Sequence, residues 1–247
     1  MTAFLVMQLY GPMAAWGEQA VGQVRRSAVH PSKSAVLGLC AAAMGIKRED
    51  EDQHNALAIL LKFGTEVLSI GSLIKDYHTT QVPPKRTKVH HLYTRKDELA
   101  EPDLGTILSS REYRQDALFK VVLWQADGER GKLDEIVDKL KQPHFHLYLG
   151  RKSCPLALPL NPKVINAASL SDACIAYPAP LFTENITAIG RLRNEQGSLY
   201  WESSEHSGMD ENEHDMRVLR YDQPLSRKRW QFTSRDEYIR LAKAKGE

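Results

Sequence analysis

Two short and almost continuous apolar runs, residues 4–9 and 118–124, lie far apart in the chain. Runs of this kind are typical of strands buried within a sheet. Each is followed by a segment with helical character, at residues 33–44 and 132–141. The chain therefore presents strand and helix in the same order twice, and this repetition restricts the folds open to it.

Local signals set the bounds of these helices. Ser32 is a suitable N-cap and Gly45 a suitable left-handed stop for residues 33–44. That segment is rich in Ala and Leu and apolar nearly all round, so we expect it to be buried against a sheet. Residues 132–141 place apolar side chains at i, i+3, i+4 and i+7, which predicts an amphipathic helix.

Further elements complete the order up to Gly150. We expect a second helix over residues 51–63, a strand over 66–80 with a bulge or turn at Gly71, and a short strand over 145–149. The sequence of elements predicts an α+β, ferredoxin-like fold, with two helices packed on one face of a four-stranded antiparallel sheet. The other face would be left for a partner, as in RNA-recognition modules.

A long basic segment interrupts this order. Residues 81–114 begin near two prolines and hold few apolar anchors, and long loops in compact domains are usually functional or disordered. We expect a projecting hairpin there, with residues 106–113 as its return strand. It would be an insertion into a first domain of residues 1–155, followed by a β-rich annex over residues 156–247. The annex strands are expected at residues 187–192, 198–202, 216–221 and 229–233.

Composition excludes several classes of protein. With 247 residues and 42% hydrophobic residues, the chain can build a core, and disorder or a collagen-like repeat is excluded. No apolar run reaches the ~20 residues of a membrane span, and the N-terminus lacks the basic region of a signal peptide. The three cysteines, Cys40, Cys154 and Cys174, are widely spaced and predict reduced thiols in a cytoplasmic protein.

Positive charge is clustered although the net charge is only +2. Residues 75–96 hold six basic residues and one acidic residue, and residues 217–245 hold nine basic and three acidic residues. Residues 202–215, in contrast, contain six acidic residues and no Lys or Arg. Basic clusters in a nearly neutral chain indicate either a polyanion site or simply solvated faces.

The start of the helix at residues 33–44 is one candidate anion site. Free backbone N–H groups at a helix N-terminus favour an anion, and the side chains of Ser32, Lys33 and Ser34 lie there. Arg25 and Arg26 precede this position. Ordinary helix capping explains the same residues, and the glycines of a P-loop are missing.

Two further sets combine an aromatic ring with cations. The predicted strand at residues 145–149 exits with Tyr148, Arg151 and Lys152, and Arg111 and Tyr113 flank an acidic residue beside a buried strand. Rings can stack on bases while cations contact phosphates or base edges. A basic loop on a core strand is the structural alternative.

Neither a metal nor a cofactor is predicted. The closest histidine pairs, His90 with His91 and His144 with His146, lack a third or fourth ligand at supporting spacing. A metal-independent endoribonuclease would need a base and an acid. His78, His30, Tyr77 and Lys33 could be combined in that way, although no spacing singles them out, so this alternative stays open.

Five separated motifs, taken in order, resemble the CasD family of type I-E Cascade subunits of bacterial CRISPR immunity. They are G-P-M-x-A-W-G at residues 11–17, P-S-x-S at 31–34, D-Y-H-T at 76–79, R-E-Y at 111–113 and Y-L-G-R-K-S-C-P-L at 148–156. The resemblance covers residues 3–160 and is weaker at residues 229–232.

This resemblance implies a ferredoxin-like member of the repeat-associated RNA-binding superfamily without catalytic activity. Such a subunit binds the 5′ handle of the guide RNA (crRNA) and docks a thumb hairpin on the neighbouring backbone subunit. It also contacts the large subunit, and it meets target DNA only through the complex. Relatives in another subtype cut RNA, which keeps a repeat-cleaving endoribonuclease as the alternative. A structural adaptor that touches RNA little is a third class.

Carried over by position, the resemblance implies roles for individual residues. Trp16 would be a core wedge or a stacking surface on the RNA path. Arg25 and Lys33 would hold handle phosphates, Tyr77 and His78 would lie where a strand meets the thumb, and Arg111 would lie at its return. Tyr148, Arg151 and Lys152 would lie at the exit of the last strand. The complete set expected to bind RNA is Trp16, Arg25, Arg26, Ser32, Lys33, Ser34, Tyr77, His78, Arg111, Tyr113, Tyr148, Arg151 and Lys152.

Overall fold

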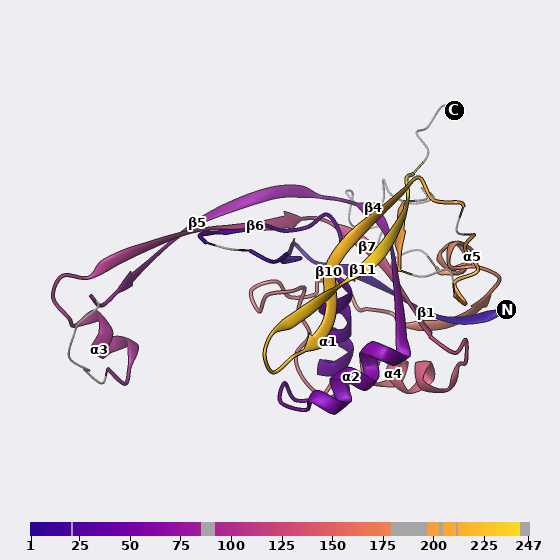
Figure 1. Ribbon diagram of the computed structural model, residues 1–247, viewed down its shortest axis with the longest axis horizontal. Coiled ribbons are helices and arrows are strands. Elements are labelled where there is room, and N and C mark those ends of the chain that lie inside the picture. Colours follow the sequence, from indigo (N-terminus) through magenta and orange to yellow (C-terminus); the bar gives the residue numbers. More distant parts are fainter. Residues whose placement is uncertain (21, 85–91, 179–196, 203–204, 211, 243–247) are drawn as a thin grey trace.

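The computed structural model describes residues 1–20, 22–84, 92–178, 197–202, 205–210 and 212–242. It is a mixed α/β structure with one large antiparallel sheet (Figure 1). The strands are β1 (Thr2–Tyr10), β2 (Met13–Ala14), β3 (Val24–Arg25), β4 (Leu61–Ser69), β5 (Ser72–Val82), β6 (Gly105–Gln115), β7 (Leu118–Gln125), β8 (Lys163–Ala167), β9 (Ser198–Trp201), β10 (Met216–Ser226) and β11 (Gln231–Arg240). The helices are α1 (Lys33–Met44), α2 (Glu51–Leu60), α3 (Arg95–Leu99), α4 (Gly131–Lys141) and α5 (Leu170–Ala176).

The two apolar runs of the sequence are neighbours in the middle of the sheet. The strand order is β10-β11-β9-β4-β7-β1-β8, and β1 pairs with β7 in a register that joins Leu5 to Leu123 and Tyr10 to Leu118. Both strands are buried along almost their whole length. Their burial on both faces explains why they read as continuous apolar runs instead of alternating ones.

Helices α1, α2 and α4 cover one face of this sheet. Leu5, Met7 and Leu9 point into the core on that side, together with Phe119 and Val121 from β7. The predicted bounds and caps of α1 are confirmed, since the Ser32 side chain accepts from the Ala35 amide and Gly45 is left-handed with φ of 78°. Helix α4 also lies where the sequence predicts it.

The expectation that the other face is open is wrong. Phe4 and Val6 of β1 and Trp124 of β7 pack beneath α5 and residues of the C-terminal part, including Trp201 and Met209. Figure 1 shows α5 on the side of the sheet opposite to α1 and α4. Large apolar side chains cover both faces because burying each one stabilises the fold by about 1.5–3 kcal/mol. The described residues of this region thus leave no open sheet surface for a base to stack on.

Two predicted elements differ from the structure. Residues 145–149 form no strand apart from a single bridge between Tyr148 and Pro155, and the strand beside β1 is β8 instead. The second helix ends at Leu60 instead of residue 63, after which the chain enters β4. Phe145, Leu147 and Leu149 stand at alternate positions as in a strand, so the sequence pattern does not distinguish this segment from a true sheet strand.

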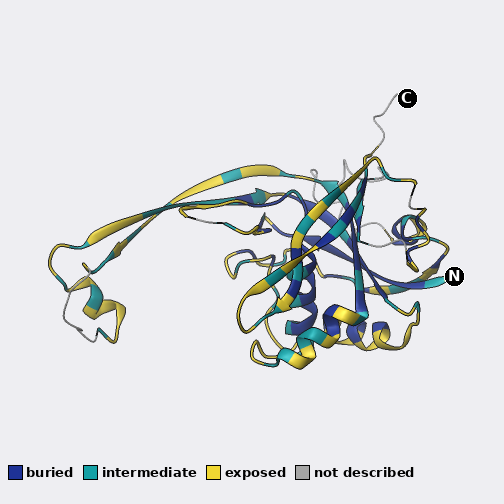
Figure 2. Cartoon of the chain, viewed as in Figure 1, coloured by how far each residue is buried: buried dark blue, intermediate teal, exposed yellow. Residues whose placement is uncertain are grey.

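The β5–β6 hairpin projects from the body and ends near the short helix α3 (Figure 1). It pairs continuously from Ser72 opposite Gln115 to Val82 opposite Gly105, so it starts closer to the body than the sequence suggests. The return strand is confirmed. Gly71 forms the predicted turn, with φ of 66° and no room for a Cβ, which would lie 2.1 Å from the Gln115 carbonyl oxygen. Figure 2 shows that the outer hairpin is mainly exposed.

The C-terminal strands extend the large sheet. Strand β9 pairs with both β4 and β11, and β10 pairs with β11 at the sheet edge. The strand expected at residues 187–192 lies outside the described residues.

All three cysteines are free and buried. Burial raises the pKa of Cys40 to about 12 and also raises the pKa values of Cys154 and Cys174. No helix in the described part of the chain is long and apolar enough to span a membrane.

Candidate nucleic-acid interface

Four separate segments meet at the base of the β5–β6 hairpin. Residues 11–17 lie against the turn at 148–155, where the Ala15 amide donates to the Leu149 carbonyl over 3.0 Å. Residues 24–28 join them, since the Ala28 amide donates to the Trp16 carbonyl over 2.8 Å. Strand β6 is the fourth segment, and it pairs with both β2 and β3. Three of the motifs noted in the sequence are thus brought together.

Two glycines permit this close approach. A Cβ on Gly150 would lie 1.9 Å from the Ala15 carbonyl oxygen, and φ at this position is +85°. A Cβ on Gly11 would lie 2.6 Å from the Pro155 carbonyl oxygen. Only glycine fits backbone that approaches so closely. The turn that carries Tyr148, Arg151 and Lys152 is therefore locked to the start of the chain.

Arg151 lies over the ring of Tyr113, with 4.8 Å between the guanidinium carbon and the ring centroid. Tyr113 is buried against the core, so the ring is a fixed platform for the cation. The Nη1 atom of Arg151 is buried and makes no hydrogen bond within the described part of the chain. A guanidinium carries five N–H donors, so Arg151 has donors beyond this buried atom.

Arg25 and Arg111 are paired across neighbouring strands. Strand β3 runs parallel to β6 with Arg25 opposite Arg111, and Asp76 of β5 lies opposite Arg111 on the other side. Residues opposite each other in a sheet share a face. Arg25 is exposed, and its Nη1 donates to the Gly22 carbonyl over 2.6 Å. The neighbouring Arg26 is also exposed.

Tyr77 and His78 occupy opposite faces of β5, because successive strand residues alternate. Tyr77 is 68% exposed, which leaves its ring free for contact. His78 lies opposite Ser109 and shares a face with Arg111. On the other face, Lys75 and Glu112 form a long ion pair of 3.9 Å. Tyr148 and Lys152 are exposed at the neighbouring turn.

Trp16 is a core residue and not a stacking surface. Its side chain is 2% exposed and packs edge-on against Phe119, with 5.7 Å between ring centroids. Trp16 was expected to be either a wedge in the core or a stacking surface for RNA, and its burial supports the first alternative.

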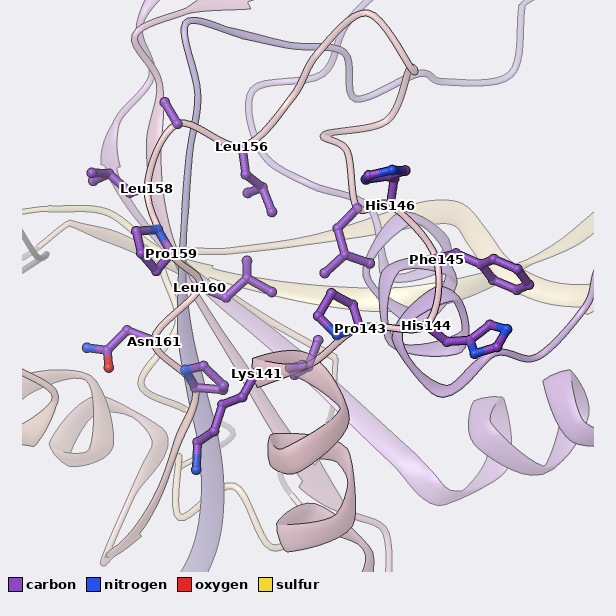
Figure 3. Close-up of a pocket in the computed structure, with 14 residues that line it drawn as sticks. Lys141, Pro143, His144, Phe145, His146, Leu156, Leu158, Pro159, Leu160 and Asn161 are labelled. Carbon is purple, nitrogen blue, oxygen red and sulfur yellow. The ribbon is translucent and has the colours of Figure 1, made fainter.

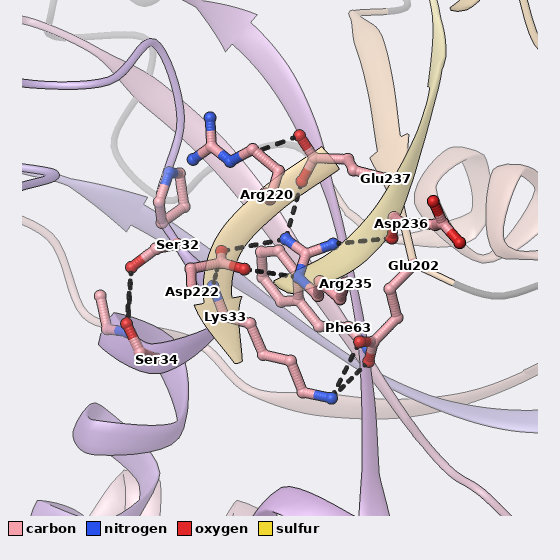
Figure 4. Close-up of polar contacts among 12 residues, drawn as sticks. Ser32, Lys33, Ser34, Phe63, Glu202, Arg220, Asp222, Arg235, Asp236 and Glu237 are labelled. Carbon is pink, nitrogen blue, oxygen red and sulfur yellow. Dashed lines mark hydrogen bonds and ion pairs between the residues drawn. The ribbon is translucent and has the colours of Figure 1, made fainter. Parts of the chain in front are cut away.

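The N-terminus of α1 is occupied by the protein itself, as Figure 4 shows. The Ser32 hydroxyl caps the helix and also contacts the Ser34 hydroxyl. The backbone amide of Lys33 donates to Asp222 of β10 over 2.8 Å. The predicted phosphate site at Ser32, Lys33 and Ser34 is therefore wrong for this structure, because a carboxylate already fills it.

The Lys33 ammonium is likewise engaged. It forms an ion pair with Glu202, at 2.8 Å, and both side chains are almost fully buried. Burial lowers the pKa of Lys33, and the negative charge of Glu202 offsets only part of that shift. The role predicted for Lys33 is thus replaced by a structural one.

A buried ionic network continues from this point (Figure 4). Arg235 binds Asp222 through two hydrogen bonds of 2.7 and 3.0 Å and also donates to Glu237 over 2.7 Å. His30 contacts Glu237 at 3.2 Å. Burial alone would raise the pKa of Glu237, but His30, Arg235 and Arg220 outweigh it and lower the pKa to about 2. The network joins the C-terminal strands to α1.

The sequence reasoning did not find this network. Asp222 and Arg235 were counted only as members of a charged segment. The signal was present in the alternation along β11, where buried positions recur at Arg235, Glu237 and Ile239. Charged residues at buried positions of a strand indicate internal ion pairs.

The histidines that the structure describes show no metal-binding arrangement. Within the described residues, no group of three or more His, Cys, Asp or Glu side chains could hold a metal ion. His90 and His91 lie outside those residues. His144 and His146 line a surface groove beside the end of α4 (Figure 3). That groove is lined mainly by Leu and Pro, without a carboxylate or thiol.

The residues combined for an endoribonuclease are divided between two places. His30 and Lys33 are buried in the ionic network, whereas Tyr77 and His78 lie on the projecting hairpin. The structure does not bring these four side chains into one site.

The chain belongs to the Cas5 family of CRISPR-associated proteins, since the model of that family (Cas_Cas5) matches residues 4–238. It is similar to the CRISPR system Cascade subunit CasD of Escherichia coli (strain K12), with 29% identity over 239 residues, which is 97% of this chain and 96% of that protein. The resemblance inferred from the five motifs is thereby confirmed.

Solved structures share the fold. A chain of a CRISPR RNA-guided surveillance complex superposes with a TM-score of 0.64 at 23% identity, over 97% of this chain and 90% of that chain. A crystal structure of a Cas protein gives a TM-score of 0.63 at 27% identity, over 97% of this chain and 94% of that chain.

Proposed function

We propose that this chain is a non-catalytic, RNA-binding subunit of a CRISPR Cascade surveillance complex. It binds the 5′ handle of the guide RNA at the base of the β5–β6 hairpin. The observation that carries this proposal is the convergence of Arg25, Arg111 and Arg151 from three distant segments. The similarity to CasD supports membership of such a complex.

Recognition at this site follows from residue chemistry. Arg25, Arg111 and Lys152 hold phosphates, while Tyr148 offers an exposed ring to an unstacked base. Tyr77 offers another exposed ring on the opposite face of the hairpin. Arg151 lies beside them over the ring of Tyr113, and its buried Nη1 has no hydrogen-bond partner among the described residues. Binding through phosphates weakens as salt rises, owing to counterion release.

The arrangement of the body supports a ferredoxin-like assignment, which we propose for strands β4, β7, β1 and β8 with helices α1 and α4. The order β4-β7-β1-β8 has the first and third strands of the unit side by side in the centre, as that fold requires. The fourth strand is β8, which lies beyond the proposed boundary at residue 155.

The hairpin is proposed to act as a thumb that docks on the adjacent backbone subunit, and the body to contact the large subunit. The length and exposure of β5 and β6 support this role, since a ribbon with little core of its own gains stability from a partner. Target DNA would be reached only through the complex.

Purification of the assembled complex tests the proposal. With the wild-type chain, RNA sequencing should find one defined short RNA, and Arg111→Gln or Arg151→Gln should lower its occupancy several-fold. Lys139→Gln, which removes an exposed cation of α4, is the control and should leave occupancy unchanged. Equal RNA occupancy in all variants would contradict the proposed site.

Two further experiments distinguish the proposed RNA-binding subunit from an endoribonuclease and from a structural adaptor. Incubation of the chain with labelled repeat RNA in EDTA should give no cleavage, whereas a single product with a 2′,3′-cyclic phosphate would establish an endoribonuclease. Crosslinking within the complex should join Arg111 and Lys152 to RNA. Crosslinks to protein alone would favour the structural adaptor.

A further inference from the structure

A second basic and aromatic cluster lies at the turn between β10 and β11. Trp230 is 57% exposed, although it is one of the largest apolar side chains. The guanidinium of Arg48, from the α1–α2 connection, lies over its ring at 4.7 Å, and that of Arg227 lies over it at 5.2 Å. Planar cations and an indole thus form one stacked group at the surface.

The backbone at Trp230 is unusual for its residue type. Its φ is +58°, in the left-handed region that favours glycine. A bulky residue in that conformation persists only where its surroundings hold it, and such residues concentrate at binding sites. An exposed tryptophan here gains no core burial that would offset the strain.

Two cations of this cluster form no ion pair with a described carboxylate. Within the described part of the chain, Arg227 and Arg48 have no carboxylate at ion-pair distance. Burial, and then the positive charge of Arg48, lower the pKa of Arg227. The nearby Glu51 is engaged by the backbone amide of Lys228 over 2.9 Å. Two close cations without a counter-ion favour the arrival of an anion.

The cluster lies near the segment that carries Tyr148. A Cβ added at Gly38 of α1 would lie 2.5 Å from the Nη2 atom of Arg227. The turn between β10 and β11 therefore packs closely against that helix. Tyr148 lies within electrostatic range of Arg227. Figure 1 shows the β10–β11 turn on the side of the body from which the hairpin leaves. Tyr148, which belongs to the same segment as Arg151 and Lys152, is thus near this turn.

We infer that Arg48, Arg227 and Trp230 form a second contact for the RNA strand held at the hairpin base. A base stacks on the exposed guanidinium–indole group, and the exposed Lys228 and Arg229 neutralise neighbouring phosphates. The guanidinium–indole group favours a nucleic acid over an acidic side chain. A base has a flat ring that can stack on this group, whereas a carboxylate has none. The inference rests on the proposed function, because the strand must first reach Tyr148.

Intrinsic fluorescence gives a selective readout. The chain has four tryptophans, and Trp16, Trp124 and Trp201 are each no more than 2% exposed. A neutral quencher such as acrylamide therefore reaches mainly Trp230. Bound RNA should reduce that quenching about threefold or more if a base covers the indole.

The experiment uses the full chain with a short unstructured RNA, the matching DNA and polyglutamate as probes. RNA should protect Trp230, and Arg48→Gln should weaken RNA binding about tenfold. Trp230→Gly should weaken it similarly while the fold is kept, because glycine accepts the left-handed backbone. Lys139→Gln is again the matched control and should bind as wild type.

The possible failures are distinguishable. This inference alone would be overturned by one set of results. RNA would bind the wild-type chain without changing the quenching of Trp230, and Arg48→Gln and Trp230→Gly would bind RNA normally. Arg111→Gln would still weaken binding. Protection by DNA or polyglutamate but not by RNA would also overturn it. Absence of any RNA binding would overturn this inference together with the proposed function.

Discussion

The backbone amide of Lys33, the first residue of α1, donates to the Oδ2 atom of Asp222 in β10. Asp222 at the same time holds Arg235 of β11 through both carboxylate oxygens. One carboxylate thus stabilises a helix end and neutralises a buried guanidinium. The C-terminal strands supply an internal anion at the start of α1, where the sequence alone suggests an external one.

Asp222→Ala should lower the free energy of unfolding by about 3–5 kcal/mol, since it leaves a buried cation and a helix amide without their partner. Urea denaturation followed by circular dichroism measures this change. Asp236→Ala is the matched control, because Asp236 pairs with Arg217 at an exposed position and should matter little. Similar losses in the two variants would show that the network does not secure the C-terminal strands.

Glu237 should make folding sensitive to acid. Its pKa is about 2 in the folded chain and near 4.5 for an exposed glutamate, so its contribution is complete above pH 4.5. As pH falls from 4.5 towards 2, the unfolded chain takes up the proton first and stability is lost.

Glu237→Gln should therefore flatten the stability profile between pH 4.5 and 2, besides lowering stability at neutral pH. Chemical denaturation at a series of pH values measures both effects. If Glu237→Gln lost as much stability between pH 4.5 and 2 as the wild type, other carboxylates would dominate unfolding by acid.

Gly150→Ala should destabilise the chain by about 3 kcal/mol, because it combines left-handed strain with a collision against the Ala15 carbonyl. Gly22→Ala carries similar strain, at φ of +88°, but meets nothing within 4 Å. It should cost only about 1 kcal/mol. Thermal and urea unfolding compare the two variants, and equal losses would argue against a close contact between the two loops.

Local signals in the sequence were sufficient for elements that depend on local physics. Ser32 and Gly45 define α1 through capping, and Gly71 defines a turn through its positive φ. The apolar runs at β1 and β7 identify the centre of the sheet because both faces must be buried. None of these predictions requires knowledge of distant partners.

Predictions that depend on long-range pairing were less successful. Residues 145–149 and β8 both follow α4, and periodicity cannot decide which of them pairs with β1. Lys33 has the chemistry of a phosphate ligand, and only the return of β9 and β10 brings Glu202 and Asp222 to it. The residues at the hairpin base were predicted from the order of the five motifs, which resembles that of a known family. Their spacing along the chain did not predict that they lie together.

The buried thiols open an experimental route to the projecting hairpin. Cys40, Cys154 and Cys174 are enclosed and held in the protonated state, so a maleimide probe should ignore them under native conditions. A cysteine placed at the exposed Lys75 or Tyr93 would then carry a fluorophore or spin label alone, without removal of the native sulfur atoms. Spectroscopic rulers could follow how the arm bends as the ribonucleoprotein assembles.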